Sequence, residues 1–166
     1  MKLPLELKWG LLLGLASLLW LYLSFWMGMH GTLLGIQVVT LVSLLISIVI
    51  YIFALGSYRT TYPESTYLEG LKAGAGIAGI AAVMAVGAQA GYHFVVNPGF
   101  TDFMVGETEK FYLSQGVAED EARRLGEASA KTFGFTSYAI QAALGAIITG
   151  VVTSAIILLI LKRKGI

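Results

Sequence analysis

The sequence contains no cysteine, and only 13% of its 166 residues are charged. Without cysteine the chain has no disulfide framework, no thiolate metal site and no thiol nucleophile. Its net charge of +1 argues against nucleic acid as a partner, because a phosphate-binding surface needs clustered Lys and Arg. Soluble domains have about a quarter of their residues charged, so lipid is the expected solvent of this chain.

What the chain has instead is long uncharged stretches. No Lys, Arg, Asp or Glu occurs from Trp9 to Tyr58, a length that crosses about 30 Å of hydrocarbon twice. The turn between the two crossings is predicted at residues 28–31, where glycines and a histidine interrupt the apolar run. Two further uncharged stretches, Ala73–Thr101 and Thr132–Leu161, predict a third and a fourth span.

The predicted fold is an all-α membrane protein with four transmembrane helices arranged as two hairpins. The expected helices cover about residues 8–28, 33–56, 66–96 and 135–161. We expect the whole chain, 1–166, to form a single transmembrane domain, with an external amphipathic helical loop at about 97–134. Gly116 is the expected break between two short helices in that loop.

The distribution of basic residues predicts the orientation. Seven Lys and Arg lie in the two termini and the second loop, whereas the third loop has four basic against seven acidic residues, a net charge of −3. Because basic residues near span ends are retained in the cytoplasm, both termini are predicted to be cytoplasmic. The expected location is the bacterial inner (plasma) membrane, crossed several times.

Small residues are concentrated in the third predicted span, where 13 of the 19 residues in 73–91 are Gly or Ala. Such residues let helix backbones approach closely in lipid. This indicates packing inside the bundle, with self-association into a homodimer as the alternative. The residues predicted to serve helix packing are Gly74, Gly79, Gly87, Gly91, Ala143 and Gly150.

Polar residues in the second span fall within about a third of the helical circumference. They suit either a solute path or hydrogen bonds between helices, and the absence of charged residues at mid-membrane favours the second interpretation. The residues of the candidate polar path, including two from the third and fourth spans, are Gln37, Thr40, Ser43, Ser47, Gln89 and Gln141.

Groups able to carry chemistry are few. His30 and His93 are predicted on the same side of the membrane as acidic residues of the third loop, but no short motif fixes a metal site. No serine lies in a nucleophile elbow. Glu69 and Lys72 are three residues apart, which predicts an interfacial ion pair. The sequence therefore predicts no enzyme, no metal and no cofactor.

The external loop carries the candidate partner surface. Large apolar side chains recur there at helical spacing, and they must be covered by lipid, by the rim of the bundle or by another protein. These side chains are Phe100, Phe103, Met104 and Phe111.

Several segments together resemble a known family. TYLEGLKAG opens the third predicted span, NPGF closes it, and an acidic, glycine-divided loop precedes a last span that ends in basic residues. In this order and spacing the chain resembles an uncharacterised family of small four-helix bacterial inner-membrane proteins, known as a domain of unknown function. Ala118 departs from the expected pattern, because a capping Ser or Asp is expected there. The resemblance implies the topology and implies no chemistry.

The function predicted from the sequence is that of a non-enzymatic accessory or interaction subunit. It would act in the lipid bilayer by binding another membrane protein or a second copy of itself. The alternative is a small dimeric transporter or channel.

Overall fold

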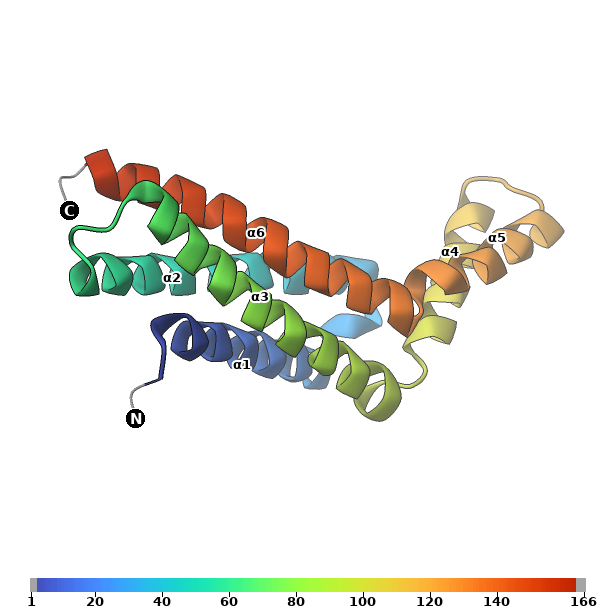
Figure 1. Cartoon of the computed structure of the whole chain (residues 1–166). Coiled ribbons are helices and arrows are strands. Elements are labelled where there is room, and N and C mark those ends of the chain that lie inside the picture. The colour runs from blue at the N-terminus through green and yellow to red at the C-terminus, as the bar shows by residue number, and fades with distance from the viewer. Residues whose placement is uncertain (1–2, 164–166) are drawn as a thin grey trace. The chain divides into compact units, whose positions relative to one another are not determined.

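A computed structural model describes residues 3–163, and the side chains of all of these except 33, 162 and 163. Every regular element of this part is helical (Figure 1). In chain order they are α1 (Leu5–Trp26), η1 (Met29–Gly31), α2 (Leu33–Thr61), α3 (Tyr67–Gly91), η2 (Tyr92–Val96), α4 (Phe100–Ser114), α5 (Glu119–Phe133) and α6 (Phe135–Arg163).

Four of these segments are long and apolar enough to cross a membrane. The candidate spans are Leu5–Trp26, Leu34–Thr61, Tyr67–Val96 and Phe135–Leu161. By helix length and hydropathy the chain is a multi-pass membrane protein, and the predicted fold class is confirmed. The α4 and α5 helices lie between the third and fourth spans in the sequence, as expected for the external loop.

The first hairpin turns at the predicted residues. Gly28 adopts a left-handed φ of 75°, which glycine reaches without steric cost, and η1 follows it directly. Beyond the turn, Thr32 caps α2 by accepting a hydrogen bond from the amide of Gly35 at 3.0 Å. The indole Nε1 of Trp20 donates to the carbonyl of Val39 at 3.0 Å, which joins α1 to α2.

The start of α3 is fixed by a capping box. The Thr66 amide donates to Glu69 Oε2 at 2.7 Å, and the Glu69 amide donates back to Thr66 Oγ1 at 3.3 Å. Glu69 is therefore engaged with the helix end. Within residues 3–163 it forms no ion pair with Lys72, unlike the pair predicted from their spacing.

The third span ends in a single wide turn. The Asn97 amide donates to the carbonyl of Tyr92 at 2.7 Å, a bond that spans five residues and is typical of a π-helical turn. Asn97 also donates from its side chain to the Tyr92 hydroxyl at 2.9 Å. Pro98 follows, and the end of the span at the Asn97–Pro98 pair is confirmed.

The α4 and α5 helices pack against each other as a hairpin. Gly116, with a left-handed φ of 79°, ends α4, and the Val117 amide closes the turn on the carbonyl of Tyr112 at 3.1 Å. On α5, a Cβ built at Gly126 would lie 3.0 Å from the carbonyl oxygen of Val105 on α4. Ala118 is the N-cap residue of α5 and forms no side-chain cap, because alanine has no hydrogen-bond acceptor in its side chain.

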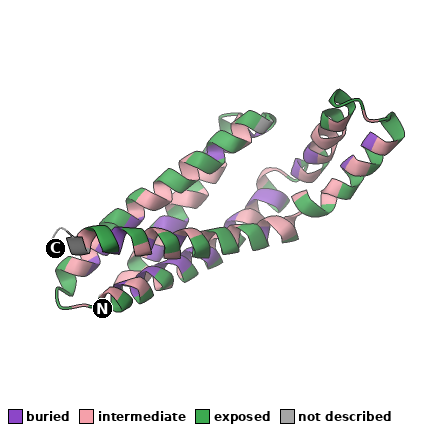
Figure 2. Cartoon of the chain, turned by 90° about the horizontal axis from the view of Figure 1, so that it is seen from above, coloured by how far each residue is buried: buried purple, intermediate pink, exposed green. Residues whose placement is uncertain are grey.

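The chain divides into two compact units. Unit 1 comprises Met1–Ala85 with Ala143–Ile166, and unit 2 comprises Val86–Ala142. Figure 2 shows burial interrupted along every helix by exposed positions, as expected where long helices present apolar side chains to lipid.

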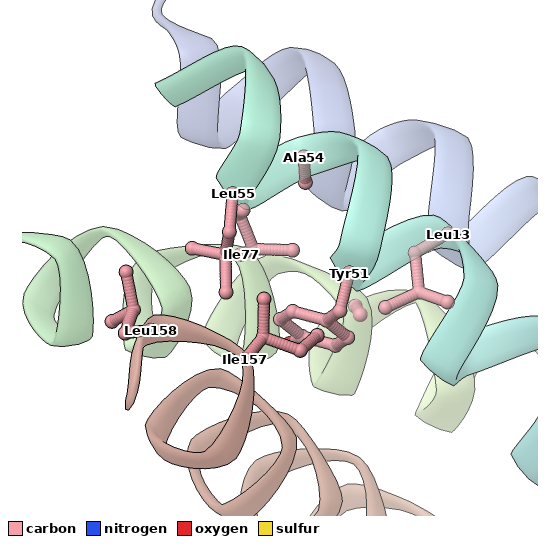
Figure 3. Packing of buried hydrophobic residues seen from close by; sticks show 8 residues of the cluster. Leu13, Tyr51, Ala54, Leu55, Ile77, Ile157 and Leu158 are labelled. Atoms are coloured by element: carbon pink, nitrogen blue, oxygen red, sulfur yellow. The ribbon is translucent and has the colours of Figure 1, made fainter. Parts of the chain in front are cut away.

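The core of unit 1 draws side chains from all four of its helices. Tyr51 is 1% exposed and lies at its centre, between α3 and α6 (Figure 3). Around it pack Leu13, Ala54, Leu55, Ile77, Ala81, Ile157 and Leu158.

Candidate functional surfaces

Two of the small residues predicted to serve packing lie in tight contacts within unit 1. Gly74 on α3 and Gly150 on α6 are both buried. A Cβ at Gly74 would overlap the side chain of Ser154, and a Cβ at Gly150 would lie 2.7 Å from the Cβ of Ala78. The Tyr51 side chain also occupies the space beside Gly150. A larger residue at either glycine would push α3 and α6 apart.

The other predicted packing residues are placed differently. Gly79 and Gly87 are exposed, and nothing lies within 4 Å of a Cβ built on either of them. Gly91 and Ala143 are half-buried. Two of these six residues thus lie in tight contacts inside unit 1, two are exposed and two are half-buried, and their common role in packing stays a prediction.

Two of the polar residues of the candidate path on α2 use their hydrogen bonds locally. Thr40 Oγ1 donates to the carbonyl of Ile36 at 3.0 Å, and Ser43 Oγ donates to that of Val39 at 2.8 Å. Ser47 is half-buried, while Gln37 is exposed on the same helix. Hydroxyl groups bonded to their own helix do not offer a continuous row of donors to a solute.

Gln89 and Gln141, the remaining two residues of that prediction, belong to unit 2. Gln141 Nε2 donates to Ser137 Oγ at 2.9 Å one turn earlier on α6, so it too bonds within its own helix. Gln89 is half-buried, and its main-chain carbonyl accepts a hydrogen bond from His93.

His93 lies inside an aromatic cluster in unit 2. Its side chain is 6% exposed, and its Nδ1 donates to the carbonyl of Gln89 at 3.1 Å. Ring centroids of Tyr138, Phe100 and Tyr92 lie 5.3, 5.4 and 5.5 Å from the imidazole. The separations are those of favourable aromatic pairs, so the ring acts as a packing element of this cluster.

His30 is bound within the first turn. Ser24 Oγ donates to the carbonyl of Leu21 at 2.9 Å, so His30 Nε2, 2.9 Å from the same oxygen, is the donor to it. Burial lowers the pKa of His30 below the ordinary histidine value of 6.5. No group of three His, Cys, Asp or Glu gathers anywhere in the described residues, so neither histidine lies in an assembled metal site there.

The predicted partner stripe is divided by burial. Phe100 and Met104 are buried, and Phe100 contacts the Tyr92 and Tyr138 rings at centroid distances of 5.5 and 5.3 Å. Phe103 is half-buried. Phe111, by contrast, is 52% exposed near the end of α4. Unit 2 itself covers the first part of the stripe and leaves Phe111 open.

The charged residues of α4 and α5 pair along their own helices. Lys110 bonds Glu107 at 2.7 Å, and Arg124 bonds Glu121 at 2.6 Å. A longer pair joins Arg123 to Glu119 at 3.5 Å. These exposed pairs contribute little to stability. The three ion pairs involve three of the four basic residues in 97–134, so the acidic excess of this segment remains at its surface.

Sequence reasoning missed one feature that the pattern itself shows. Thr66 and Glu69 have the Thr-x-x-Glu spacing of a capping box, which precedes an apolar run here. The hydrogen bond of Trp20 was also missed, and no local signal predicts it, because its acceptor Val39 lies on another helix.

The described spans and the polar hairpin define a multi-pass helical membrane protein. The chain matches the family described as "Protein of unknown function (DUF4199)" over residues 8–163, and it therefore belongs to that family. The expected resemblance to a family of unknown function is confirmed to this extent. No curated protein and no solved structure matches the chain.

Proposed function

We propose that this protein is a non-enzymatic binding protein of the membrane, whose working surface is the α4–α5 hairpin. The observation that carries the proposal is the exposure of Phe111, 52%, together with that of Leu113, 42%. Both lie at the tip of a hairpin that is otherwise polar. Large apolar side chains that protrude from a polar surface are typical of sites that bind another protein.

The charge of the hairpin specifies the partner further. Residues 97–134 have a net charge of −3, and Asp120 and Glu127 are exposed. Among the described residues neither of them forms an ion pair. An acidic, partly apolar surface is complementary to a protein with a basic rim around an apolar pocket. Anionic lipid headgroups would repel the same surface.

The proposal includes an orientation. With seven basic residues at the termini and second loop against four in the hairpin region, both termini are cytoplasmic and the hairpin lies outside the bacterial inner membrane. In this arrangement the hairpin meets partners of the cell envelope rather than of the cytoplasm.

Photo-crosslinking tests the proposal. A photoreactive amino acid at Phe111 is expected to give a protein adduct of discrete mass in native membranes. The yield of this adduct should fall when salt is raised before irradiation, because salt weakens the complex. The matched control is the same amino acid at Leu45, which is exposed on α2 within a span and should crosslink to lipid. Lipid adducts alone at both positions would contradict the proposal.

A second candidate function, a small dimeric transporter or channel, is favoured by the outer face of α2. Gln37 and Thr40 are exposed there although they lie in a candidate span. Polar side chains in spans usually face a bundle interior or a cavity, which a second copy would create. A Gln37→Cys variant would then form a disulfide-linked dimer on mild oxidation, whereas Leu45→Cys would not. Equal amounts of dimer from both variants would remove this candidate.

A further inference from the structure

The end of α2 carries an arginine that forms no ion pair within the described part of the chain. Arg59 lies in the last turn of α2, within unit 1. The ion pairs found among residues 3–163 all lie in α4 and α5, so none involves Arg59. Glu69 and Glu6, the carboxylates that act on the adjacent Tyr58, form no ion pair with Arg59, and Glu69 is engaged in the capping box of α3. An arginine at a span end extends its charged group to the membrane interface, where the anionic phosphates of lipid headgroups are available.

The guanidinium group is held in one orientation by the main chain. Arg59 Nη1 donates to the carbonyl of Ser65 at 2.5 Å, across the link that leads to α3. This bond uses one edge of the planar group. The opposite edge, formed by Nε and Nη2, remains, and it is the edge that matches two oxygens of a carboxylate or phosphate.

The remaining edge is without a partner in the part of the chain that the structure describes. Arg59 Nε is buried and makes no hydrogen bond, and Nη2 makes none either. Ser65 Oγ is also buried, and it lies within hydrogen-bonding reach of the Tyr58 phenol. When the phenol donates to Ser65 Oγ, the Ser65 proton remains available for a further acceptor. Buried polar atoms are nearly always satisfied in native proteins, so the unpaired Nε of Arg59 indicates a missing acceptor.

We propose that Arg59 and Ser65 form a binding site for a phosphate group, supplied by the headgroup of a phospholipid. Both groups can donate, Arg59 is cationic, and the site lies at the end of a span, where lipid phosphates are found. The Nε and Nη2 groups donate to two phosphate oxygens, and the Ser65 hydroxyl donates to one of them. This site belongs to unit 1 and does not involve the hairpin to which the proposed function is assigned.

Binding of short-chain lipids to the purified full chain in detergent tests the site. Dioctanoyl phosphatidylglycerol is titrated and complexes are counted by native mass spectrometry, with dioctanoyl glycerol as the phosphate-free probe. Arg59→Gln should weaken phosphatidylglycerol binding about tenfold, which corresponds to about 1.4 kcal/mol. Arg59→Lys should lose several-fold, because a lysine keeps the charge but not the fork. Lys72→Gln, which removes an exposed cation near the same end, should stay within about twofold of the parent.

Two arms identify the source of the phosphate and exclude general effects. Inorganic phosphate that displaces the lipid and binds in an Arg59-dependent manner would assign the site to free phosphate instead. Equal binding of dioctanoyl glycerol and phosphatidylglycerol, or equal losses in the Arg59 and Lys72 variants, would overturn the proposal. If the Arg59 variants fail to fold, the wild-type protein decides: its Arg59 Nε–H resonance should shift on adding phosphatidylglycerol, and an unchanged resonance overturns the site.

Discussion

The two units of this protein close their interiors in opposite ways. In unit 1 the absence of side chains at Gly74 and Gly150 lets α3 and α6 approach closely, beside the centrally placed Tyr51. In unit 2 large rings, among them Phe100 and Tyr138, surround His93. In a bilayer the hydrophobic effect does not drive helices together, because lipid tails are as apolar as the side chains. Close van der Waals contact between backbones therefore stabilises the packing. Unit 2 includes the hairpin outside the spans and relies on ring burial.

The largest difference is expected for a ring substitution in unit 2. Phe100→Ala should lower the free energy of unfolding by about 3–5 kcal/mol, because it removes a side chain that is 2% exposed and contacts several rings. Phe111→Ala is the matched control and should cost less than about 1 kcal/mol, because Phe111 is half exposed. Thermal unfolding in detergent, followed by circular dichroism, measures both. Equal losses would mean that unit 2 has no ring-based core.

An added side chain in unit 1 should have the next largest effect. Gly74→Leu is expected to cost about 1–3 kcal/mol, because the new side chain overlaps Ser154. Gly79→Leu on the same helix meets open space and should change the unfolding temperature little in the monomeric protein. The same melting experiment checks this pair. A Gly79→Leu variant as unstable as Gly74→Leu would show that the two glycines share one crowded face.

A smaller effect is expected at the start of α3. Thr66→Ala removes the capping hydroxyl and should cost about 1 kcal/mol. Thr60→Ala is a suitable control, since the Thr60 hydroxyl bonds only to its own helix, at Gly56 and Ser57, and this change should cost less than about 0.5 kcal/mol. Melting temperatures of both variants, measured under identical detergent conditions, compare them. If Thr60→Ala proves the more damaging, the capping box does not stabilise α3.

The smallest effect is a pH dependence confined to unit 1. Burial holds the pKa of His30 in the folded chain below its unfolded value of 6.5. Below about pH 6.5 the unfolded chain therefore binds more protons than the folded chain. The contribution of His30 to stability is present above about pH 6.5 and is lost as the pH falls below it. His30→Gln keeps a donor for Ser24 and should flatten the slope of stability between pH 7 and pH 5, roughly the range in which histidine titrates. An unchanged slope would remove His30 as its source.

Much of the fold could be predicted because it depends on local composition. Uncharged stretches predict the spans, and glycine at positions 28 and 116 predicts the turns, since both adopt a left-handed backbone. The roles of individual glycines could not be predicted in the same way. Gly74 and Gly79 are five residues apart, so they point roughly 140° away from each other on a helix, and only the assembled bundle decides which of them is covered.

The candidate surfaces show the same limit. The apolar stripe of α4 is visible as a sequence pattern. The burial of Phe100, however, depends partly on the ring of Tyr138, which is 38 residues away in the sequence. The Thr66–Glu69 spacing is that of a capping box, but the spacing of Glu69 to Lys72 equally predicts an ion pair. Both patterns require the Glu69 carboxylate, and in the structure it accepts a hydrogen bond from the Thr66 amide at the start of α3.

The measurement that tests this account most directly is the accessibility of single cysteines, because the sequence contains none of its own. In spheroplasts, a membrane-impermeant maleimide should label Gln115→Cys at the hairpin tip without permeabilisation. Thr61→Cys, at the end of α2, should react only after the membrane is opened, and Leu45→Cys should resist the reagent throughout. Labelling of Gln115→Cys only after permeabilisation, or ready labelling of Leu45→Cys, would contradict an external binding hairpin carried by four lipid-embedded spans.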